Sequence, residues 1–294
     1  MSEPLRVIVA GASGFIGQRA VVALRGAGHA VAELRREDIA ALTHSPSAAG
    51  IHSIGSRLDA AFAGSDAARV LVWAAGKRES DLAANREIHA RAPLDVRDAL
   101  VVSRVVYLST GEVYGDAPLP YRETGPTNGT SEYARAKLEG EAALLGPGPA
   151  SAAVLRLALV YGPGSKPPML IPRVAAALRA GERMAMTRGE QTRDLVFVDD
   201  VAAAIVAAAE SAEVGIFNIG SGVETRIKDV ILGIADAIAS EGGRTREQLA
   251  ELLGFGEVAL RPDEAHRYVM DISRARDVLG WRATTALADG LARL

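Results

Sequence analysis

Cysteine is absent from the 294-residue sequence. Its absence excludes disulfides, thiolate metal sites and a cysteine nucleophile, so any chemistry must use oxygen or nitrogen groups or a bound cofactor. The five histidines show no spacing that would place two metal ligands on one helix face; they are His29, His44, His52, His89 and His266. We therefore predict no metal site and expect these histidines to be solvated or bonded locally.

The sequence also lacks an excess of either charge and any long hydrophobic run. Lysine and arginine number 33 against 36 acidic residues, a formal net charge of −3, which predicts no nucleic-acid partner. The longest charge-free alanine-valine run, residues 201–209, is far shorter than the ~18 residues of a membrane span. The opening MSEPLRVIVAG has neither the basic end nor the apolar stretch of a signal peptide. We expect a cytoplasmic protein with no membrane partner.

Hydrophobic residues are abundant, at 49% of the chain, which is enough for a sizeable core. In the first half, short β-branched runs alternate with longer alanine-rich segments that have a helical pattern. This alternation predicts βαβ units, and the continuously apolar strands indicate a parallel sheet covered on both faces. The runs and segments, in chain order, are 6–10, 15–25, 30–34, 70–74, 84–100, 105–108, 131–145 and 153–160.

The pattern changes after the loop GPGSKPP at residues 162–168. We expect an α/β fold with a Rossmann-like doubly wound parallel sheet, formed by residues 1–162 and 192–220. The strand 194–198, the helix 201–210 and the strand 215–219 are expected to return to this domain. Residues 163–191 and 221–294 would form a smaller, mixed substrate-binding lobe.

A glycine-rich turn follows the first predicted strand. The run Gly11-Ala-Ser13-Gly14-Phe15-Ile16-Gly17 leads into a helical segment. Its glycines stand where a tight turn, a close approach of backbone to a diphosphate and helix-strand packing each need one. We predict a dinucleotide site formed by these residues, because the run lies between a first strand and a first helix.

The end of the second strand indicates which dinucleotide is bound. An acid there usually holds a ribose 2′-hydroxyl, whereas a 2′-phosphate needs a cation. The chain has Glu33-Leu-Arg35-Arg36, so Arg35 and Arg36 favour NADP over NAD. The alternative is that both arginines are a solvated helix entry and Glu33 holds the ribose of NAD.

Tyr133 and Lys137 lie four residues apart on a predicted helix and so project from one face. A nearby ammonium stabilises a phenolate and moves its pKa towards the working range of an acid-base group. The alternative is a surface tyrosine beside an ordinary lysine, but the upstream dinucleotide turn and the strand-end Ser109-Thr110 favour a catalytic pair.

The sequence resembles the extended short-chain dehydrogenase/reductase superfamily, the NAD(P)-dependent nucleotide-sugar epimerases, dehydratases and reductases. The resemblance covers nearly the whole chain. It rests on GASGFIG, VLVWAAGK, VVYLSTGEVYG, YARAK, LRLALVYGPG, TRDLVFVDDV, IFNIGSG and DISRARDVLGW.

The resemblance implies roles for individual residues. Thr110 would hydrogen-bond the reacting sugar oxygen, Tyr133 would be the acid-base, and Lys137 would tune it and hold the nicotinamide ribose. Positions that line the cofactor in the family correspond to Ala74, Ala75 and Lys77. Arg193 and Arg261 match arginines that clamp the nucleotide diphosphate, with a surface salt bridge as the alternative for Arg261.

The chain departs from the family pattern at several positions. His89 stands where an asparagine is frequent, for which Asn85 is a candidate substitute, and the asparagine that touches the nucleotide near Leu159 is missing. Dehydratases of the family carry Asp and Glu after the threonine, whereas this chain has Gly111 and Glu112. Because glycine cannot transfer a proton, a 4,6-dehydratase is disfavoured. Glu112 is either a structural loop carboxylate or a contact to a substrate hydroxyl.

Three functions follow from this pattern. The first is an NADP-dependent reductase of a nucleotide-linked 4-keto-6-deoxy sugar, and the second is a nucleotide-sugar 4-epimerase with tightly bound NAD. The third is a cofactor-binding regulatory protein without turnover, which the presence of Thr110, Tyr133 and Lys137 disfavours. Family members commonly form homodimers through helices at positions corresponding to 84–100 and 133–145, so we expect a homodimer.

Overall fold

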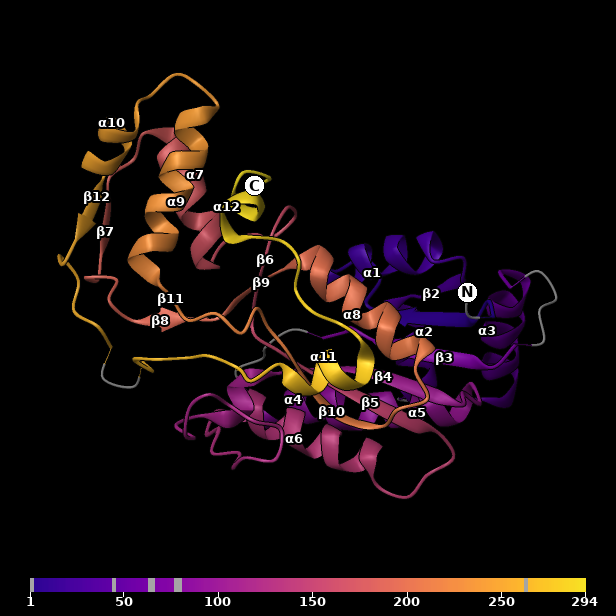
Figure 1. The fold of residues 1–294 in the computed structure, drawn as a ribbon. Helices are drawn as coiled ribbons and strands as arrows, with labels where there is room; N and C mark the ends of the chain where they lie inside the picture. The colour runs from indigo at the N-terminus through magenta and orange to yellow at the C-terminus, as the bar shows by residue number, and fades with distance from the viewer. Residues whose placement is uncertain (1–2, 44–45, 63–66, 77–80, 262–263) are drawn as a thin grey trace.

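A six-stranded parallel sheet organises the larger part of the molecule (Figure 1). The computed structural model describes residues 3–43, 46–62, 67–76, 81–261 and 264–294. The strand order is β10-β5-β4-β3-β1-β2, and every pairing is parallel. The strands are β1 (Arg6–Ala10), β2 (Ala30–Leu34), β3 (Arg69–Trp73), β4 (Arg104–Thr110), β5 (Ser151–Leu157) and β10 (Gly215–Ile219). The Rossmann-like doubly wound sheet predicted from the sequence is confirmed.

Helices cover both faces of this sheet, which is why its strands are largely apolar. The helices α1 (Phe15–Gly26) and α8 (Val198–Glu210) pack together on one face, and α5 (Ala92–Ala99) and α6 (Glu132–Leu145) lie on the other (Figure 1). Alternate residues of β1 point to opposite faces. Val7 and Val9 belong to the core under α1 and α8, and Ile8 and Ala10 to the core under α5 and α6.

The helical segment expected over 84–100 is three pieces in the structure. They are α4 (Leu82–Arg86), a single π-helical turn η1 (Glu87–Arg91) and α5. Two further helices, α2 (Arg36–Thr43) and α3 (Ala48–Ala60), follow β2 in a stretch for which the sequence predicted no helix.

A smaller lobe stands beside the sheet and has its own core (Figure 1). Its centre is the apolar contact between α7 (Leu170–Ala180) and α9 (Ile227–Ser240). The remaining lobe elements are β7 (Met184–Met186), α10 (Arg246–Glu251), β12 (Leu253–Phe255) and α12 (Leu287–Leu291).

Short two-stranded pairs join the lobe to the sheet. The strand β6 (Leu159–Tyr161) pairs with β9 (Leu195–Phe197), and β8 (Thr192–Arg193) pairs with β11 (Thr225–Arg226). The strand expected at 194–198 therefore forms, but outside the main sheet. The chain returns to the sheet a last time at α11 (Ser273–Leu279), which packs on β10 and α8. The division of the chain into two parts stays a prediction. The helix α11 belongs to the segment 221–294 that was expected in the lobe, but it packs on the sheet domain.

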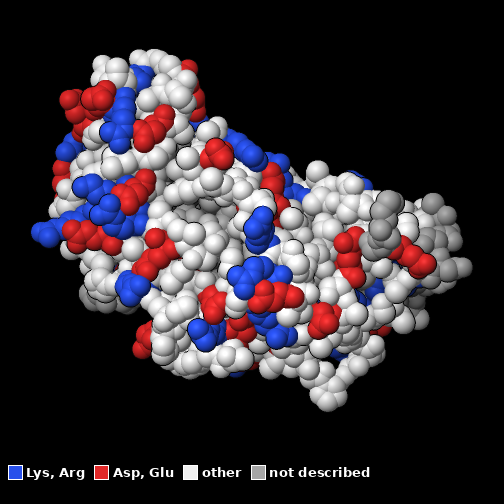
Figure 2. Space-filling model, viewed as in Figure 1, with Lys and Arg blue, Asp and Glu red and all other residues white. Residues whose placement is uncertain are grey.

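The visible surface has no field of a single charge. On the face in Figure 2, lysine and arginine side chains alternate with aspartate and glutamate over both the lobe and the sheet domain. Within the described ranges, no helix is both long enough and apolar enough to cross a membrane.

Candidate active site

The glycine turn between β1 and α1 has no room for side chains at two positions. Gly11 has φ +83°, and a Cβ there would lie 2.6 Å from the backbone of Ala74 on the neighbouring strand end. A Cβ on Gly17 would lie 2.0 Å from the carbonyl oxygen of Gly11. Gly14 caps α1, and within the described residues no side chain bonds the first N–H groups of this helix. The turn thus presents backbone donors at a helix N-terminus, where anions bind favourably.

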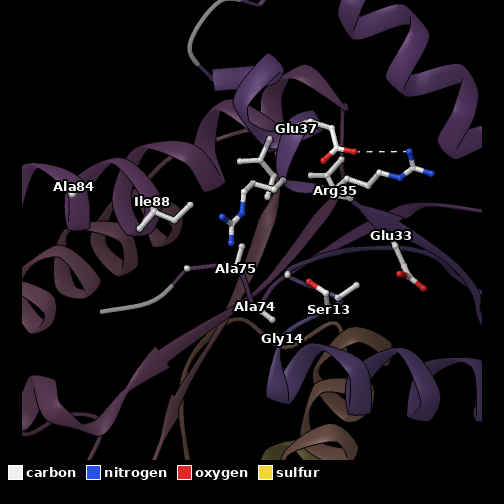
Figure 3. A pocket seen from close by; sticks show the side chains of 15 residues that line it. Ser13, Gly14, Glu33, Arg35, Glu37, Ala74, Ala75, Ala84 and Ile88 are labelled. Atoms are coloured by element: carbon white, nitrogen blue, oxygen red, sulfur yellow. Dashed lines mark ion pairs between the residues drawn. The ribbon is translucent and has the colours of Figure 1, made fainter. Parts of the chain in front are cut away.

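A cavity of about 650 Å³ opens over this turn (Figure 3). Seven of the residues predicted to hold the cofactor line it together, namely Gly11, Ser13, Gly14, Arg35, Arg36, Ala74 and Ala75. Phe15, Ile16 and Gly17 form the first turn of α1 next to the cavity and are not among its lining residues. Lys77 lies outside the described residues.

Charged side chains line the end of the cavity at β2. Arg35 faces Glu37 at 3.9 Å (Figure 3), and Glu33 accepts a hydrogen bond of 3.2 Å from Arg25. All four side chains are more than half exposed, so both ion pairs contribute little and can exchange partners. A cation and a carboxylate are therefore both available at the ribose end.

The residues around the cofactor cavity form a first cluster of predicted site residues. The second cluster, formed by the predicted catalytic residues, lies where α6 (Glu132–Leu145) begins. Lys137 is buried, its Nζ donates to the carbonyl oxygen of Leu108 at 2.6 Å, and it lies 5.7 Å from the ring centre of Tyr133. Thr110 ends β4 two residues after Leu108, and its hydroxyl accepts a hydrogen bond from the Glu112 N–H at 3.2 Å. The helix periodicity and the end of β4 thus bring Thr110, Tyr133 and Lys137 into one region.

Glu112 connects the loop after β4 to the first turn of α6. Ser131 caps α6 by accepting from the N–H of Ala134 at 3.1 Å, and its hydroxyl donates to Glu112 at 2.5 Å. The carboxylate therefore fixes the helix start that carries Tyr133 relative to the loop that carries Thr110. This contact fits the alternative in which Glu112 is a structural loop carboxylate.

Burial lowers the pKa of Lys137 to about 7, and the negative charge of Glu141 partly opposes this. Glu141 is itself shared, because it accepts from Arg156 at 2.6 Å and from Ser109 at 2.5 Å. A buried lysine with a pKa near neutrality can lose and regain a proton during turnover, as a group that resupplies an acid must do.

His89 joins the two clusters. Its buried ring meets the ring of Tyr133 edge-on at 5.1 Å, and its carbonyl oxygen accepts from the hydroxyl of Tyr107 at 2.6 Å. The preceding residue, Ile88, lines the large cavity. The π-helical turn therefore has the cofactor cavity on one side and the candidate acid-base on the other; such turns are frequent at functional sites.

Arg193 and Arg261 converge on one carboxylate. Glu264 accepts from Arg193 at 2.9 Å and lies 3.5 Å from Arg261. Arg193 is largely buried and also donates to the carbonyl oxygen of Ala265 at 2.8 Å, whereas the Arg261 side chain is 77% exposed. Burial lowers the pKa of Arg193, and Glu264 opposes that shift. The structure thus brings both predicted diphosphate ligands together, around a protein carboxylate.

The profile of the NAD dependent epimerase/dehydratase family matches residues 7–220, which include both clusters. The chain belongs to this family. The match confirms the resemblance to the extended short-chain dehydrogenase/reductases, a family of enzymes. The lobe beyond residue 220 lies outside the matched segment.

Curated relatives of this family member act on different nucleotide sugars. It is 36% identical over 202 residues to a UDP-glucose 4-epimerase of Mycolicibacterium smegmatis, with 65% of this chain and 61% of the relative aligned. It is 30% identical over 223 residues to a dTDP-glucose 4,6-dehydratase of Xanthomonas campestris, with 72% and 61% aligned. The chain thus spans about 61% of the length of these relatives.

Solved structures resemble this family member over nearly its full length. MoeE5 in complex with UDP-glucose and NAD shares 26% identity at a TM-score of 0.76, covering 98% of this chain and 96% of that one. RMD from Pseudomonas aeruginosa, complexed with NADPH, shares the fold at 23% identity and a TM-score of 0.78, covering 98% and 96%.

Sequence reasoning missed several residues that the fold places at the site. Ala84 and Ile88 line the cofactor cavity, and the helical pattern of 84–100 gave no signal for them. Tyr268 lies against Gly111 although the two are far apart in the sequence. The sequence shows that Gly111 and His89 depart from the family pattern, but it does not indicate which residues contact them. Among the described residues, no group of three or more His, Asp or Glu side chains is placed to hold a metal ion.

Proposed function

We propose that this protein is an NADP-dependent reductase of a nucleotide-linked 4-keto-6-deoxy sugar. The observation that carries the proposal is the packing at Gly111. A Cβ at this position would lie 1.8 Å from the hydroxyl of Tyr268 and 2.1 Å from Cε of Met270. The loop after Thr110 therefore has neither an acid nor space for one at residue 111. Chemistry that needs a hydride and one acid-base fits this site better than dehydration, which needs a further acid and base.

Different residues of the chain would bind the cofactor, position the sugar carbonyl and transfer the proton. The backbone N–H groups at the start of α1, directly after Gly14, would hold the diphosphate of the cofactor, and Arg35 or Arg36 its 2′-phosphate. When bound there, NADPH supplies the hydride that the sugar carbonyl carbon accepts. Tyr133 gives its hydroxyl proton to the carbonyl oxygen, so that the C=O bond becomes C–H and O–H. Thr110 holds this oxygen, and Lys137 returns a proton to Tyr133 and takes one up from solvent before the next turnover.

The substrate would lie between the sheet and the lobe. A second cavity of about 210 Å³ has mainly apolar walls from β6, β9 and the start of α7 and α9, including Leu159, Leu170 and Leu195. Apolar walls suit a nucleobase, and Arg193 with Arg261 would take the diphosphate in place of Glu264. The solved complex of MoeE5 with UDP-glucose supports a nucleotide sugar as the ligand class.

The second candidate is a nucleotide-sugar 4-epimerase that keeps NAD bound. Two observations favour it. The relative from Mycolicibacterium smegmatis is a UDP-glucose 4-epimerase, and Glu33 lines the cavity where it could accept from a ribose hydroxyl. Such an enzyme uses the same Thr110, Tyr133 and Lys137, with Tyr133 taking the proton first and returning it later.

The test compares the two reactions in the same preparation. The protein is incubated with NADPH and the 4-keto-6-deoxy product of a dTDP-glucose 4,6-dehydratase, and nicotinamide absorbance and sugar product are followed. We expect one NADPH oxidised per sugar reduced, and no turnover with Tyr133→Phe. Tightly bound NAD in the purified protein, with interconversion of UDP-hexoses without added cofactor, would overturn the reductase and establish the epimerase.

Two further predictions accompany this proposal. We propose a homodimer formed through the surfaces of α4, α5 and α6; within the chain, α4 and α5 each pack on α6. Sedimentation of the purified protein tests it, and a monomer at micromolar concentration would contradict it. The cytoplasmic location stays a prediction.

A further inference from the structure

A buried pair of opposite charges lies behind the predicted catalytic residues. Arg156 on β5 donates to both carboxylate oxygens of Glu141 on α6, with Nη2 to Oε2 at 2.6 Å. Both side chains are only 3% exposed, and neither lines the cofactor cavity. A buried ion pair adds little to net stability, because the cost of desolvation offsets the attraction. Stability alone therefore does not account for this pair.

Two consecutive residues of β4 hold two consecutive turns of α6. The Leu108 carbonyl oxygen accepts from Nζ of Lys137 at 2.6 Å, and the Ser109 hydroxyl donates to Glu141 at 2.5 Å. Lys137 and Glu141 are four residues apart and so project from one face of the helix. Thr110 is the next residue of β4. Glu141 therefore fixes the strand end that carries Thr110 against the helix that carries the predicted acid-base.

Arg156 reaches the same loop from the neighbouring strand. It lies opposite Ser109 in the register of β4 and β5, and its guanidinium carbon is 4.8 Å from the ring centre of Tyr114. Tyr114 ends η2 (Gly111–Tyr114), the short 3₁₀ turn that follows Thr110. The carboxylate of Glu141 is thus divided between a guanidinium and a hydroxyl that the sheet itself holds in place.

The carboxylate of Glu141 acts on the proton of Lys137. Burial lowers the pKa of Lys137 to about 7, and the charge of Glu141 acts in the opposite direction. Without that charge, a lysine buried to this degree would be mainly deprotonated at neutral pH. A deprotonated lysine has no proton to return to Tyr133. The charge of Glu141 therefore decides how much of Lys137 is in the useful form.

Other titratable groups on the elements packed against α6 have different partners. The ring centre of Tyr107 on β4 lies 4.7 Å from Nζ of Lys137, but burial raises the pKa of this phenol well above its ordinary value, so it is neutral. The ring of His89 on η1 contacts Tyr133. The charged side chains with other partners are Arg86 with Glu139, Arg91 with Asp95, Arg97 with Asp98, Glu132 with Arg135, Glu112 with Ser131, and Arg104 with the carbonyl oxygens of Ala208 and Glu213. Glu141 is thus the carboxylate that acts on Lys137.

We propose that Glu141 is a positioning residue for proton transfer, whose buried carboxylate keeps Lys137 protonated. Arg156 and Ser109 hold this carboxylate in place, and the guanidinium keeps it ionised. The inference rests on the proposed reaction with Tyr133 as the acid-base. In each turnover Lys137 gives one proton to Tyr133 and takes one up from solvent. Glu141 acts on the second step, because a nearby anion favours reprotonation of the amine.

The first experiment measures the proton on Lys137 directly. The chain has only four lysines, Lys77, Lys137, Lys166 and Lys228, so labelling lysine with ¹³C at Cε gives few NMR signals. The signal of Lys137 is the one missing from Lys137→Met, and its chemical shift is followed with pH. We expect a midpoint of about 7 in the unaltered protein. In the double variant Glu141→Gln with Arg156→Gln, the midpoint should be lower by about one pH unit or more.

Both charges are removed together because a single substitution would leave a buried charge without its partner, which strongly destabilises a fold. The double variant also leaves the net charge of the protein unchanged. Glu141→Leu with Arg156→Met replaces the pair by apolar side chains and should give a shift in the same direction. Glu139→Gln is the matched control on the same helix. Its side chain is 41% exposed and pairs with Arg86 at the surface, so the midpoint of Lys137 should stay unchanged.

A kinetic measurement follows from the same change. With NADPH and a 4-keto-6-deoxy sugar nucleotide, kcat should fall as pH rises through the basic limb set by Lys137. That limb should move about one pH unit lower in the double variant, and kcat should approach that of the unaltered protein at pH values below both limbs. The KM for NADPH should change little. A pair that only supports the fold would lower Tm and leave the limb in place.

The outcomes separate this inference from the proposed function. An unchanged midpoint of Lys137 in both double variants would overturn the inference, whatever their activity. An equal shift in Glu139→Gln would also overturn it, because any negative charge on the helix would then have the same effect. A shifted midpoint in a protein that reduces no keto sugar would refute the reductase and still support the effect of Glu141 on Lys137.

Discussion

The cofactor side and the substrate side of this molecule are built in different ways. On the cofactor side, backbone dominates: Gly11 and Gly17 allow β1, α1 and the end of β3 to approach each other, and the cavity opens above them. On the substrate side, side chains dominate. Tyr268 reaches Gly111, and Glu264 gathers Arg193 and Arg261, from segments far apart in the sequence.

This difference explains why one side is more general than the other. A turn made of backbone donors serves any dinucleotide, and the surrounding charges only choose between a hydroxyl and a phosphate on the ribose. A site made of side chains from several segments can change its ligand by single substitutions. We therefore expect this chain's own specificity to depend on the proposed substrate side, and the variants below test the cofactor side and the predicted catalytic residues.

The largest effect is expected for Tyr133→Phe. Losing a positioned acid-base group reduces turnover about 10²- to 10⁴-fold, and the ring contact with His89 is kept. NADPH affinity should change little, because the turn at Gly11 is untouched. Steady-state kinetics and fluorescence titration with NADPH measure the two sides separately. Turnover that survives the substitution would remove Tyr133 from the mechanism.

Gly17→Ala should damage the cofactor side. Its Cβ would lie 2.0 Å from the Gly11 carbonyl oxygen, so the turn must open, and we expect NADPH affinity to fall at least about tenfold together with a lower Tm. Gly26→Ala is the matched control, because nothing lies within 4 Å of its Cβ position. That control should be neutral or stabilise by up to about 1 kcal/mol. Equal behaviour of the two variants in NADPH titration would contradict a tight turn.

Lys137→Met should change how stability depends on pH. The folded protein holds the pKa of Lys137 at about 7, below its ordinary value of 10.5. Between these values the unfolded chain binds more protons, so this lysine makes stability rise as pH increases from 7 towards 10. The stability of Lys137→Met relative to the unaltered protein should therefore be greatest below pH 7 and decline by a few kcal/mol at pH 10.

Denaturant unfolding at several pH values measures this difference, in which the titration of other groups cancels. Lys166→Met, at an exposed position, is the control and should give a difference that does not vary with pH. A flat difference for Lys137→Met as well would mean that its ammonium is not desolvated.

The smallest effect is expected at the ribose end of the cofactor cavity. Arg35→Ala should lower the preference for NADPH over NADH up to about tenfold, since one exposed charge-assisted contact is lost. Arg276→Ala, an exposed arginine on α11, should leave the preference unchanged. Competitive titration with the two cofactors measures it. If Glu33→Gln weakens NADH binding and Arg35→Ala changes nothing, Glu33 holds the ribose and NAD is the cofactor.

The sequence predicts the backbone-built part of the molecule well, for a physical reason. All six sheet strands and the four-residue spacing of Tyr133 and Lys137 depend on local periodicity and on glycine positions, which a single sequence displays. The π-helical turn was not predictable, because it depends on the packing of His89 between Tyr107 and Gly140. Arg36 lies beyond the end of β2 and begins α2, as the helix-entry alternative for the two arginines expects.

The side-chain contacts between distant segments could not be predicted, because they do not depend on local periodicity. Gly111 was recognised as unusual, but what fills its space depends on how the segment before α11 crosses to the sheet. Glu264 likewise shares no local pattern with Arg193. Long-range contacts of this kind follow from the fold and not from any window of sequence.

The most direct test of this account is a crystal structure of the protein with NADP bound. We predict that the diphosphate lies on the turn at Gly11 and Gly14, with the nicotinamide ribose within hydrogen-bonding distance of Tyr133 and Lys137. A cofactor bound elsewhere, or a nicotinamide ring remote from Thr110, Tyr133 and Lys137, would contradict it.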